Sequence, residues 1–339
     1  MKTKARLIHL IVTLLLAATA LGIGIAMNVY MNSFDHEQVA KKFSNGTRFT
    51  QITVFAPETA GLTVDKIMYF RYKLETKLTE KSITPPNDGA RLYADAFTSY
   101  VDTTLTSDSN GARTSNVKLA YVGGDYPLFY KAYRDMPNVG GDINHDRILL
   151  SRSAAWQLYG GDALYDYPVK IGPATLYISG VYPDYKESAY IKDFYGDKAA
   201  AAADIKSDTD INITCYDLIV VDPVKNFAVD TVKECLDLTE GTYLLVENSK
   251  RFSLSNLFKT IPKLVNADEP LPTGVDITPE EMAARHAEKV LAVMLVVFLV
   301  FAVYPAIWAL ILLYRLIRFI KKWFDKLVVN KVKDKLSYS

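Results

Sequence analysis

Two long apolar runs, one near each end of the 339-residue sequence, place the strongest constraint on its fold. Between residues 7 and 29 the only ionisable side chain is His9, and residues 290–314 carry no charge. About 20 apolar residues in a helix are enough to cross a hydrocarbon core about 30 Å thick. We therefore expect two transmembrane helices, over residues 7–30 and 290–314.

The first run also has an interpretation as a cleavable signal peptide. The small-residue triplet Ala18, Thr19 and Ala20 follows a leucine-rich stretch, as it does at a signal cleavage site. Apolar residues continue past this triplet to Met27, which favours an uncleaved anchor.

The distribution of charge predicts the orientation of both helices. Residues 1–6 carry three cations and no acid, and residues 315–339 carry eight cations against two acids. Lys and Arg in short flanking segments stay on the cytoplasmic side. We expect both termini in the cytoplasm and residues 35–285 outside. Residues 7–314 have a net charge of −8, which does not suit a nucleic-acid partner.

Residues 315–339 form a predicted basic amphipathic helix on the cytoplasmic side. Leu316, Ile320 and Phe324 recur at helical spacing, with cations on another face. This pattern is typical of a helix lying on a lipid surface, and a helix that docks on a cytoplasmic partner is the alternative. The candidate lipid or partner contacts are Arg318, Lys322, Trp323 and Lys326.

The segment between the two spans alternates predicted strands and helices, so we expect an α+β fold. A β-α-β core is predicted in two parts, residues 31–122 and 201–267, with an inserted small β-rich subdomain at residues 123–200. The expected strands are residues 49–55, 91–106, 114–122, 147–150, 167–171, 174–181, 215–221 and 242–246, and the expected helices are residues 63–81, 153–158 and 227–238.

Residues 268–289 are predicted to be a linker followed by a stalk helix. Thr278 is a good N-cap, Pro279 suits the first helical position, and Glu280 and Glu281 suit the first turn. Because neither Gly nor Pro follows before residue 290, we expect this helix to continue into the second span.

Between residues 121 and 181, the order of short motifs resembles the MacB-like periplasmic core domain of bacterial ABC transporter permeases of the MacB/FtsX class. The motifs are Tyr-Val-Gly-Gly-Asp-Tyr at 121–126, His-Asp-Arg-Ile-Leu-Leu-Ser at 145–151, Ala-Trp-Gln-Leu-Tyr-Gly-Gly at 155–161 and Ile-Ser-Gly-Val at 178–181. The resemblance implies structural roles for Gly123, Gly124, Asp125, Asp146, Arg147, Trp156, Leu158, Gly160 and Gly180.

The resemblance also implies partners, namely an ABC ATPase or sibling permease subunits in a homo- or hetero-oligomer. Permeases of this family usually have four spans and a cytoplasmic loop that contacts the ATPase, whereas this sequence has two apolar runs. We therefore expect an accessory or diverged subunit of half the usual length.

Motifs for catalysis or cofactor binding do not stand out. The sequence has no P-loop pattern and no Gly-x-Ser-x-Gly elbow, and its four histidines lack metal-ligand spacing. The glycine pairs at 123–124 and 160–161 are interpreted as turns rather than as phosphate loops. We expect no enzyme activity, no cofactor and no metal.

Cys215 and Cys235 are expected outside the membrane, where a disulfide can persist. A predicted strand followed by a helix that runs back along it brings the two positions towards each other. The alternative is that both are small buried apolar residues.

The leading hypothesis is a non-enzymatic membrane subunit of an ABC-type transport or mechanotransmission complex, with an outer domain coupled to the membrane by the stalk. The alternative is a stand-alone two-span receptor or binding protein for a peptide or envelope component.

Overall fold

The computed structural model describes residues 2–34, 36–43, 47–85, 87, 89–108, 111–130, 147–182, 188–192, 212–266 and 270–337. The chain divides into two compact units. We call residues 34–251 and 268–285 the sheet unit, and residues 1–33, 252–267 and 286–339 the helical unit.

The helical unit contains α1 (Lys2–Asn32), α8 (Leu254–Thr260), the 3-10 helix η6 (Ile261–Leu264) and most of α9 (Pro279–Ser337). Two helical stretches, Leu7–Asn32 and Pro279–Phe324, are long and apolar enough to cross a membrane. Their apolar 18-residue windows have mean hydropathies of 2.4 and 2.8. The helix predicted to begin after Thr278 is therefore confirmed, and it continues through Pro305.

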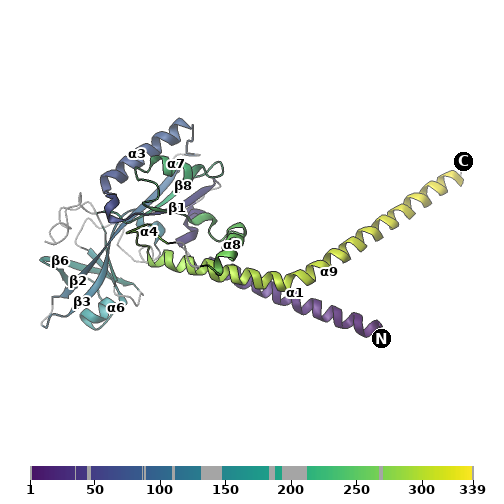
Figure 1. The fold of residues 1–339 in the computed structure, drawn as a ribbon, viewed down its shortest axis with the longest axis horizontal. Coiled ribbons are helices and arrows are strands. Elements are labelled where there is room, and N and C mark those ends of the chain that lie inside the picture. Colours follow the sequence, from purple (N-terminus) through teal and green to yellow (C-terminus); the bar gives the residue numbers. More distant parts are fainter. Residues whose placement is uncertain are drawn as a thin grey trace. The chain divides into compact units, whose positions relative to one another are not determined.

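In the sheet unit, the described strands form one nine-stranded sheet (Figure 1). Its order is β3-β7-β4-β6-β5-β2-β8-β1-β9. The strands are β1 (Phe49–Phe55), β2 (Tyr93–Ser107), β3 (Thr114–Gly124), β4 (Arg147–Ser151), β5 (Pro168–Ile171), β6 (Ala174–Tyr182), β7 (Ser188–Lys192), β8 (Cys215–Val221) and β9 (Leu244–Glu247).

Four of these strands, in the order β2-β8-β1-β9, form the predicted β-α-β core. The helix α3 (Val64–Glu80) connects β1 to β2, and α7 (Phe227–Cys235) connects β8 to β9. The strand β8 is antiparallel to β1 and β2, and β1 is antiparallel to β8 and β9. Each helix therefore joins two parallel strands that have a third strand between them. This is the split β-α-β arrangement of ferredoxin-like domains. The predicted α+β fold class is confirmed.

Side chains alternate between the two faces of these strands. The even-numbered residues Tyr216, Leu218 and Val220 of β8 belong to the largest apolar core, together with residues of α3 and α7. The odd-numbered residue Ile219 belongs to a second core with residues of α2 (Val39–Phe43) and α4 (Tyr126–Phe129). All seven residues of β8 are buried, so this strand is covered on both faces.

The strand β2 joins the core to the region predicted as an inserted subdomain. Its first residues pair with β8, and its last three, 105–107, pair with β5. The strands β4 to β7 therefore continue the same sheet. The sequence did not predict β7, which pairs with β3 and β4. The boundaries at residues 123 and 200 stay a prediction.

Most of the other predicted elements are confirmed within a few residues, including α6 (Arg152–Tyr159). Ser151 caps α6, because its side chain accepts a hydrogen bond from the Ala154 amide. Thr63 holds the N-cap position of α3, but its side chain makes no capping bond. Other short helices among the described residues are η1 (His36–Gln38), η2 (Glu58–Ala60) and η5 (Asn248–Lys250).

The glycine pair at 123–124, predicted to be a turn, instead forms the last two residues of β3, where it pairs with Phe97 and Ala96 of β2. The single helical turn α4 begins at Tyr126, although no helix was expected there. Gly124 has a φ of +72°, and a Cβ atom there would lie 2.5 Å from the Asp95 carbonyl oxygen. A Cβ atom on Gly123 would lie 2.4 Å from the Phe97 ring. Any side chain at either position would therefore displace β2 or its core aromatic residue.

Candidate functional site

The residues of the resembling motifs have separate structural positions and do not converge on one site. Asp125 pairs with Arg91, and Arg147 pairs with Asp166 over 2.6 Å. Leu158 is buried in the main core. Gly160 ends α6 with a φ of +73°, and Gly180 follows a register shift between β4 and β6. The side chain of Trp156 is exposed, and Asp146 lies outside the described residues.

The disulfide considered from the sequence is wrong, because Cys215 and Cys235 are both free and buried. Cys235 of α7 packs in the main core on one face of the sheet. Cys215 belongs to a small cluster with Phe55 and Val275. As an odd-numbered residue of β8, it points away from the face that α7 covers. Burial, followed by the nearby Asp217 carboxylate, raises the pKa of the Cys215 thiol well above its usual value.

The predicted basic contacts lie on the distal part of α9. Trp323 is exposed, as are Arg318 and Lys322. The side chain of Lys326 lies outside the described part of the chain. Contact of these residues with lipid or with a partner stays a prediction.

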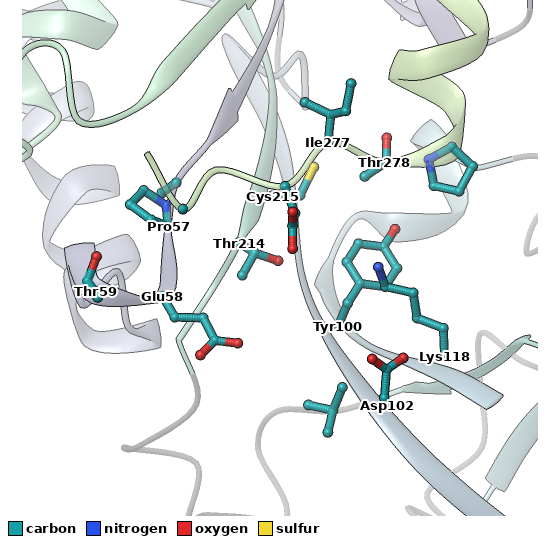
Figure 2. A pocket seen from close by; sticks show the side chains of 15 residues that line it. Pro57, Glu58, Thr59, Tyr100, Asp102, Lys118, Thr214, Cys215, Ile277 and Thr278 are labelled. Carbon is teal, nitrogen blue, oxygen red and sulfur yellow. The ribbon is translucent and has the colours of Figure 1, made fainter. Parts of the chain in front are cut away.

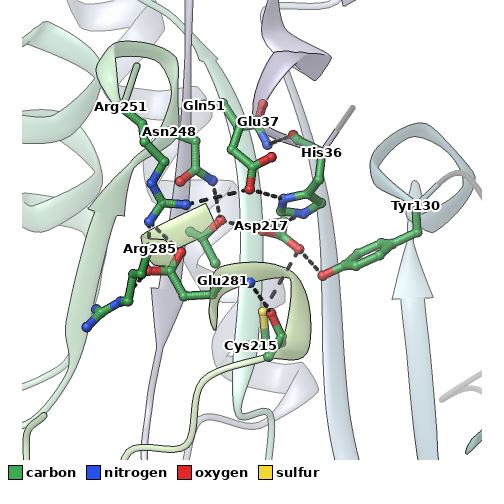
Figure 3. A network of polar contacts seen from close by, with 12 residues as sticks. His36, Glu37, Gln51, Tyr130, Cys215, Asp217, Asn248, Arg251, Glu281 and Arg285 are labelled. Carbon is green, nitrogen blue, oxygen red and sulfur yellow. Dashed lines mark hydrogen bonds and ion pairs between the residues drawn. The ribbon is translucent and has the colours of Figure 1, made fainter. Parts of the chain in front are cut away.

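A buried polar cluster on the second face of the sheet was not predicted (Figure 3). It centres on Asp217 of β8, whose side chain is only 1% exposed. Thr53, directly opposite on β1, donates a hydrogen bond to Asp217 Oδ1 over 2.5 Å. Tyr130 donates to Asp217 Oδ2 over 2.7 Å, and Asn248 donates to Thr53 Oγ1 over 2.8 Å.

The cluster continues from the sheet to the first turns of α9. Arg251 donates from one terminal nitrogen to both carboxylate oxygens of Glu281, over 2.7 and 2.6 Å. Its other terminal nitrogen lies 3.6 Å from Glu37. Arg251, Glu281 and Glu37 are all at least 95% buried. Arg285, one turn further along α9, also donates to Glu281 over 2.7 Å.

His36 connects the two parts of the cluster. Its Nε2 lies 3.6 Å from Asp217, and its Nδ1 lies 3.6 Å from Glu37. Gln51 of β1 holds this segment in place by donating to the His36 carbonyl oxygen over 2.5 Å. The three acids Glu37, Asp217 and Glu281 face two arginines, so protonation of His36 brings the formal charge of the cluster to zero.

The pKa of His36 reflects these opposing effects. Burial alone lowers the pKa of an imidazole, because it disfavours the charged form. The carboxylates of Asp217 and Glu37 outweigh burial and raise the pKa of His36 well above its usual 6.5.

The cluster residues lie next to the points where the chain passes between its two units. Glu37 follows the end of α1 by five residues, Arg251 is the last residue before Phe252, and Glu281 lies four residues before Arg285. The buried charges therefore hold three segments on the sheet. These are the segment after α1, the segment before α8 and the beginning of α9. Thr278 supports this beginning by accepting a hydrogen bond from the Glu281 amide, which confirms its predicted capping role.

One feature of the sequence does point to this cluster. Asp217 interrupts an otherwise apolar buried strand, and a buried carboxylate requires partners. The partners of Asp217, namely Tyr130, Thr53 and His36, lie 87, 164 and 181 positions away in the sequence, so no local motif identifies them.

A cleft of about 450 Å³ lies beside this cluster in the sheet unit (Figure 2). Its walls come from the turn after β1, the middle of the β2–β3 hairpin, the start of β8 and the segment before α9. The labelled polar side chains include Tyr100, Asp102, Lys118, Glu58 and Thr278. Among the described residues, no group of three or more His, Cys, Asp or Glu side chains is placed to hold a metal ion.

No family model and no curated protein matches the sequence. Among solved structures, the chain is similar to the periplasmic region of MacB from Actinobacillus actinomycetemcomitans, with 13% identity and a TM-score of 0.40, over 65% of this chain and 94% of that one. It is also similar to the extracellular domain of the noncanonic ABC-type transporter YknZ from Gram-positive bacteria, with 12% identity and a TM-score of 0.34, over 58% of this chain and 99% of that one.

The raised pKa of His36 predicts a specific dependence of stability on pH. The stabilisation from the protonated imidazole is fully present below the unfolded-state pKa of about 6.5, and it is lost as pH rises through the higher folded-state pKa. Unfolding measured between about pH 6 and pH 9 should show declining stability for the wild type and a flatter profile for His36→Gln. The exposed His286→Gln is the control and should keep the wild-type slope. A wild-type slope in His36→Gln would exclude this role of His36.

The Arg251–Glu281 pair predicts non-additive effects of mutation. Arg251→Met should cost about 3–5 kcal/mol, because it leaves buried carboxylates without their counter-charge. The double variant Arg251→Met/Glu281→Met should be more stable than the sum of the single changes predicts, by about 2 kcal/mol. Arg285→Met, at a side chain that is 32% exposed, should cost about 1 kcal/mol or less. Denaturant unfolding of the full chain measures all four variants, and additive costs would contradict a coupled pair.

Proposed function

We propose that this chain is a non-enzymatic membrane subunit of a bacterial ABC-type, MacB/FtsX-like transport or mechanotransmission complex. In this proposal α1 and α9 span the cell membrane, both termini are cytoplasmic, and the sheet unit is outside. The observation that carries the proposal is the buried polar cluster, because it joins the sheet directly to the first turns of a helix that continues through the apolar segment.

A displacement passes along a helix only where the helix is continuous and its end is fixed. The described part of α9 has no break from Pro279 to Ser337. Its first turns are fixed by Arg251, which binds Glu281 with two hydrogen bonds inside the protein. Ala284 and Ala287 are fully buried, so close packing continues past the cluster along the same helix. These features suit a rigid element that moves together with the sheet.

The cytoplasmic end of α9 is the proposed place of contact with a partner. The basic stretch after residue 314 includes Arg318 and Lys322, which are exposed beside the exposed Trp323. An ABC ATPase, a sibling permease subunit or the lipid surface can be the partner of these side chains. The resemblance noted in the sequence favours an ATPase or a sibling permease.

The cleft beside the cluster supports a second candidate function, a stand-alone two-span receptor. Its volume of about 450 Å³ suits a small ligand or a short peptide segment. In the lining of the cleft, Tyr100 provides an amphipathic surface, Lys118 a positive charge and Asp102 a negative charge. A receptor of this kind needs no ATPase.

Two measurements distinguish the two functions. They are co-purification of an ABC ATPase with the chain and the response of the sheet unit to ATP. We expect an ABC ATPase to co-purify in a fixed ratio with the full-length chain from native membranes in mild detergent. ATP should change the hydrogen exchange of the sheet unit in this complex. Ala287→Pro, which costs a helix about 3 kcal/mol, should keep the ATPase bound but abolish the response of the sheet unit to ATP.

Thr76→Gly, on the exposed surface of α3, is the matched control for a helix that lies outside the proposed route. It should retain the response to ATP. Absence of any ATPase would contradict the transporter function and favour the receptor. Retention of the response in Ala287→Pro would contradict transmission through α9.

A further inference from the structure

The short helical segment formed by α8 and η6 has an apolar face, and only part of this face is buried among the described residues. Ser253 caps α8, because its side chain accepts a hydrogen bond from the Asn256 amide. Apolar residues then recur at helical spacing through both helices. They are Leu254, Leu257, Phe258, Ile261, Leu264 and Val265.

One part of this face packs on the two long helices of the same unit. Leu257, only 1% exposed, forms a cluster with Met27 of α1 and with Leu291 and Leu295 of α9. Ile261 packs against the same cluster. Met27 lies near the end of the apolar stretch Leu7–Asn32, and Leu291 lies just after the last charged residue before the uncharged run. The segment therefore lies at the outer ends of both apolar helices.

The other part of the face has no cover within the described residues. Leu254 is 63% exposed, Phe258 is 50% exposed, and Val265 is 91% exposed. Lys259 and Lys263 are exposed on the same short segment. Exposed apolar side chains, with cations beside them, are typical of a helix that lies in a membrane interface.

We propose that α8 and η6 lie in the membrane interface, on the extracytoplasmic side of the membrane that α1 and α9 span. Leu254, Phe258 and Val265 enter the boundary between headgroups and acyl chains, and Lys259 and Lys263 lie at the phosphates of anionic lipids. The occupant is lipid rather than another protein, because the exposed face continues the apolar surface of α1 and α9 at the level where they leave the membrane.

This inference rests on the proposal that α1 and α9 span a membrane. It adds a third point of membrane contact, whose first residue, Leu254, lies three positions after Arg251 of the buried polar cluster. The state of the outer lipid surface can thus act on the cluster through α8 as well as through α9.

Spin-label accessibility tests the proposal on the full chain in phosphatidylcholine–phosphatidylglycerol nanodiscs. Single cysteines replace Leu254, Phe258 and Val265, and collision with oxygen is compared with collision with a water-soluble nickel chelate. The native Cys215 and Cys235 are buried, so unmodified protein gives the background labelling. We expect the oxygen-to-nickel ratio at the three sites to be several-fold higher than at Ser255→Cys, on the polar face of α8.

Two further labels separate failure of this inference from failure of the membrane assignment. Leu310→Cys, at a 65% exposed position of α9, should give a lipid-like ratio, and Tyr72→Cys, at a 66% exposed position of α3, should give a water-like ratio. Water-like ratios at 254, 258 and 265 with a lipid-like ratio at 310 would overturn the interfacial element alone. A water-like ratio at 310 would overturn both proposals. Three sites are labelled so that one poorly folded variant does not decide the result.

Discussion

The Arg251–Glu281 ion pair is the interaction on which the arrangement of the sheet unit depends. Both groups are at least 95% buried, and removing such charges from water is costly unless each finds a partner of good geometry. One guanidinium nitrogen contacts both oxygens of Glu281, and the other lies near Glu37. These three residues come from separate parts of the sequence. The contacts between their charged groups therefore fix three chain segments at once. The position of the first turns of α9, up to Arg285, at the sheet is a direct consequence.

The two faces of β8 explain why this cluster coexists with an ordinary core. Even-numbered residues such as Leu218 pack with α3 and α7, while Asp217 faces the opposite side with Thr53 of β1. The strand is buried on both faces, and on the second face Asp217 lies between the apolar residues Cys215 and Ile219. The polar cluster around Asp217 is where the segments next to α1 and α9 meet the sheet.

Local patterns in the sequence were enough to predict most elements but not their long-range partners. Alternation identified β1 and the β2–β3 hairpin, and the Thr278-Pro279-Glu280-Glu281 cap correctly placed the start of α9. The disulfide was wrong because strand alternation places Cys215 on the face opposite α7. The polar cluster was missed because its residues are ordinary isolated charges in the sequence, and only the folded sheet brings them together. The sequence also missed β7, a short strand whose partners β3 and β4 are distant in the chain.

The central claim is that buried charges, rather than helix propensity, hold the beginning of α9 on the sheet. Hydrogen exchange of the amides in residues 282–286 measures this most directly, in the full chain in nanodiscs. Loss of about 3 kcal/mol of stability in Arg251→Met should accelerate their exchange about 100-fold. Unchanged exchange at residues 282–286 in Arg251→Met would contradict the claim.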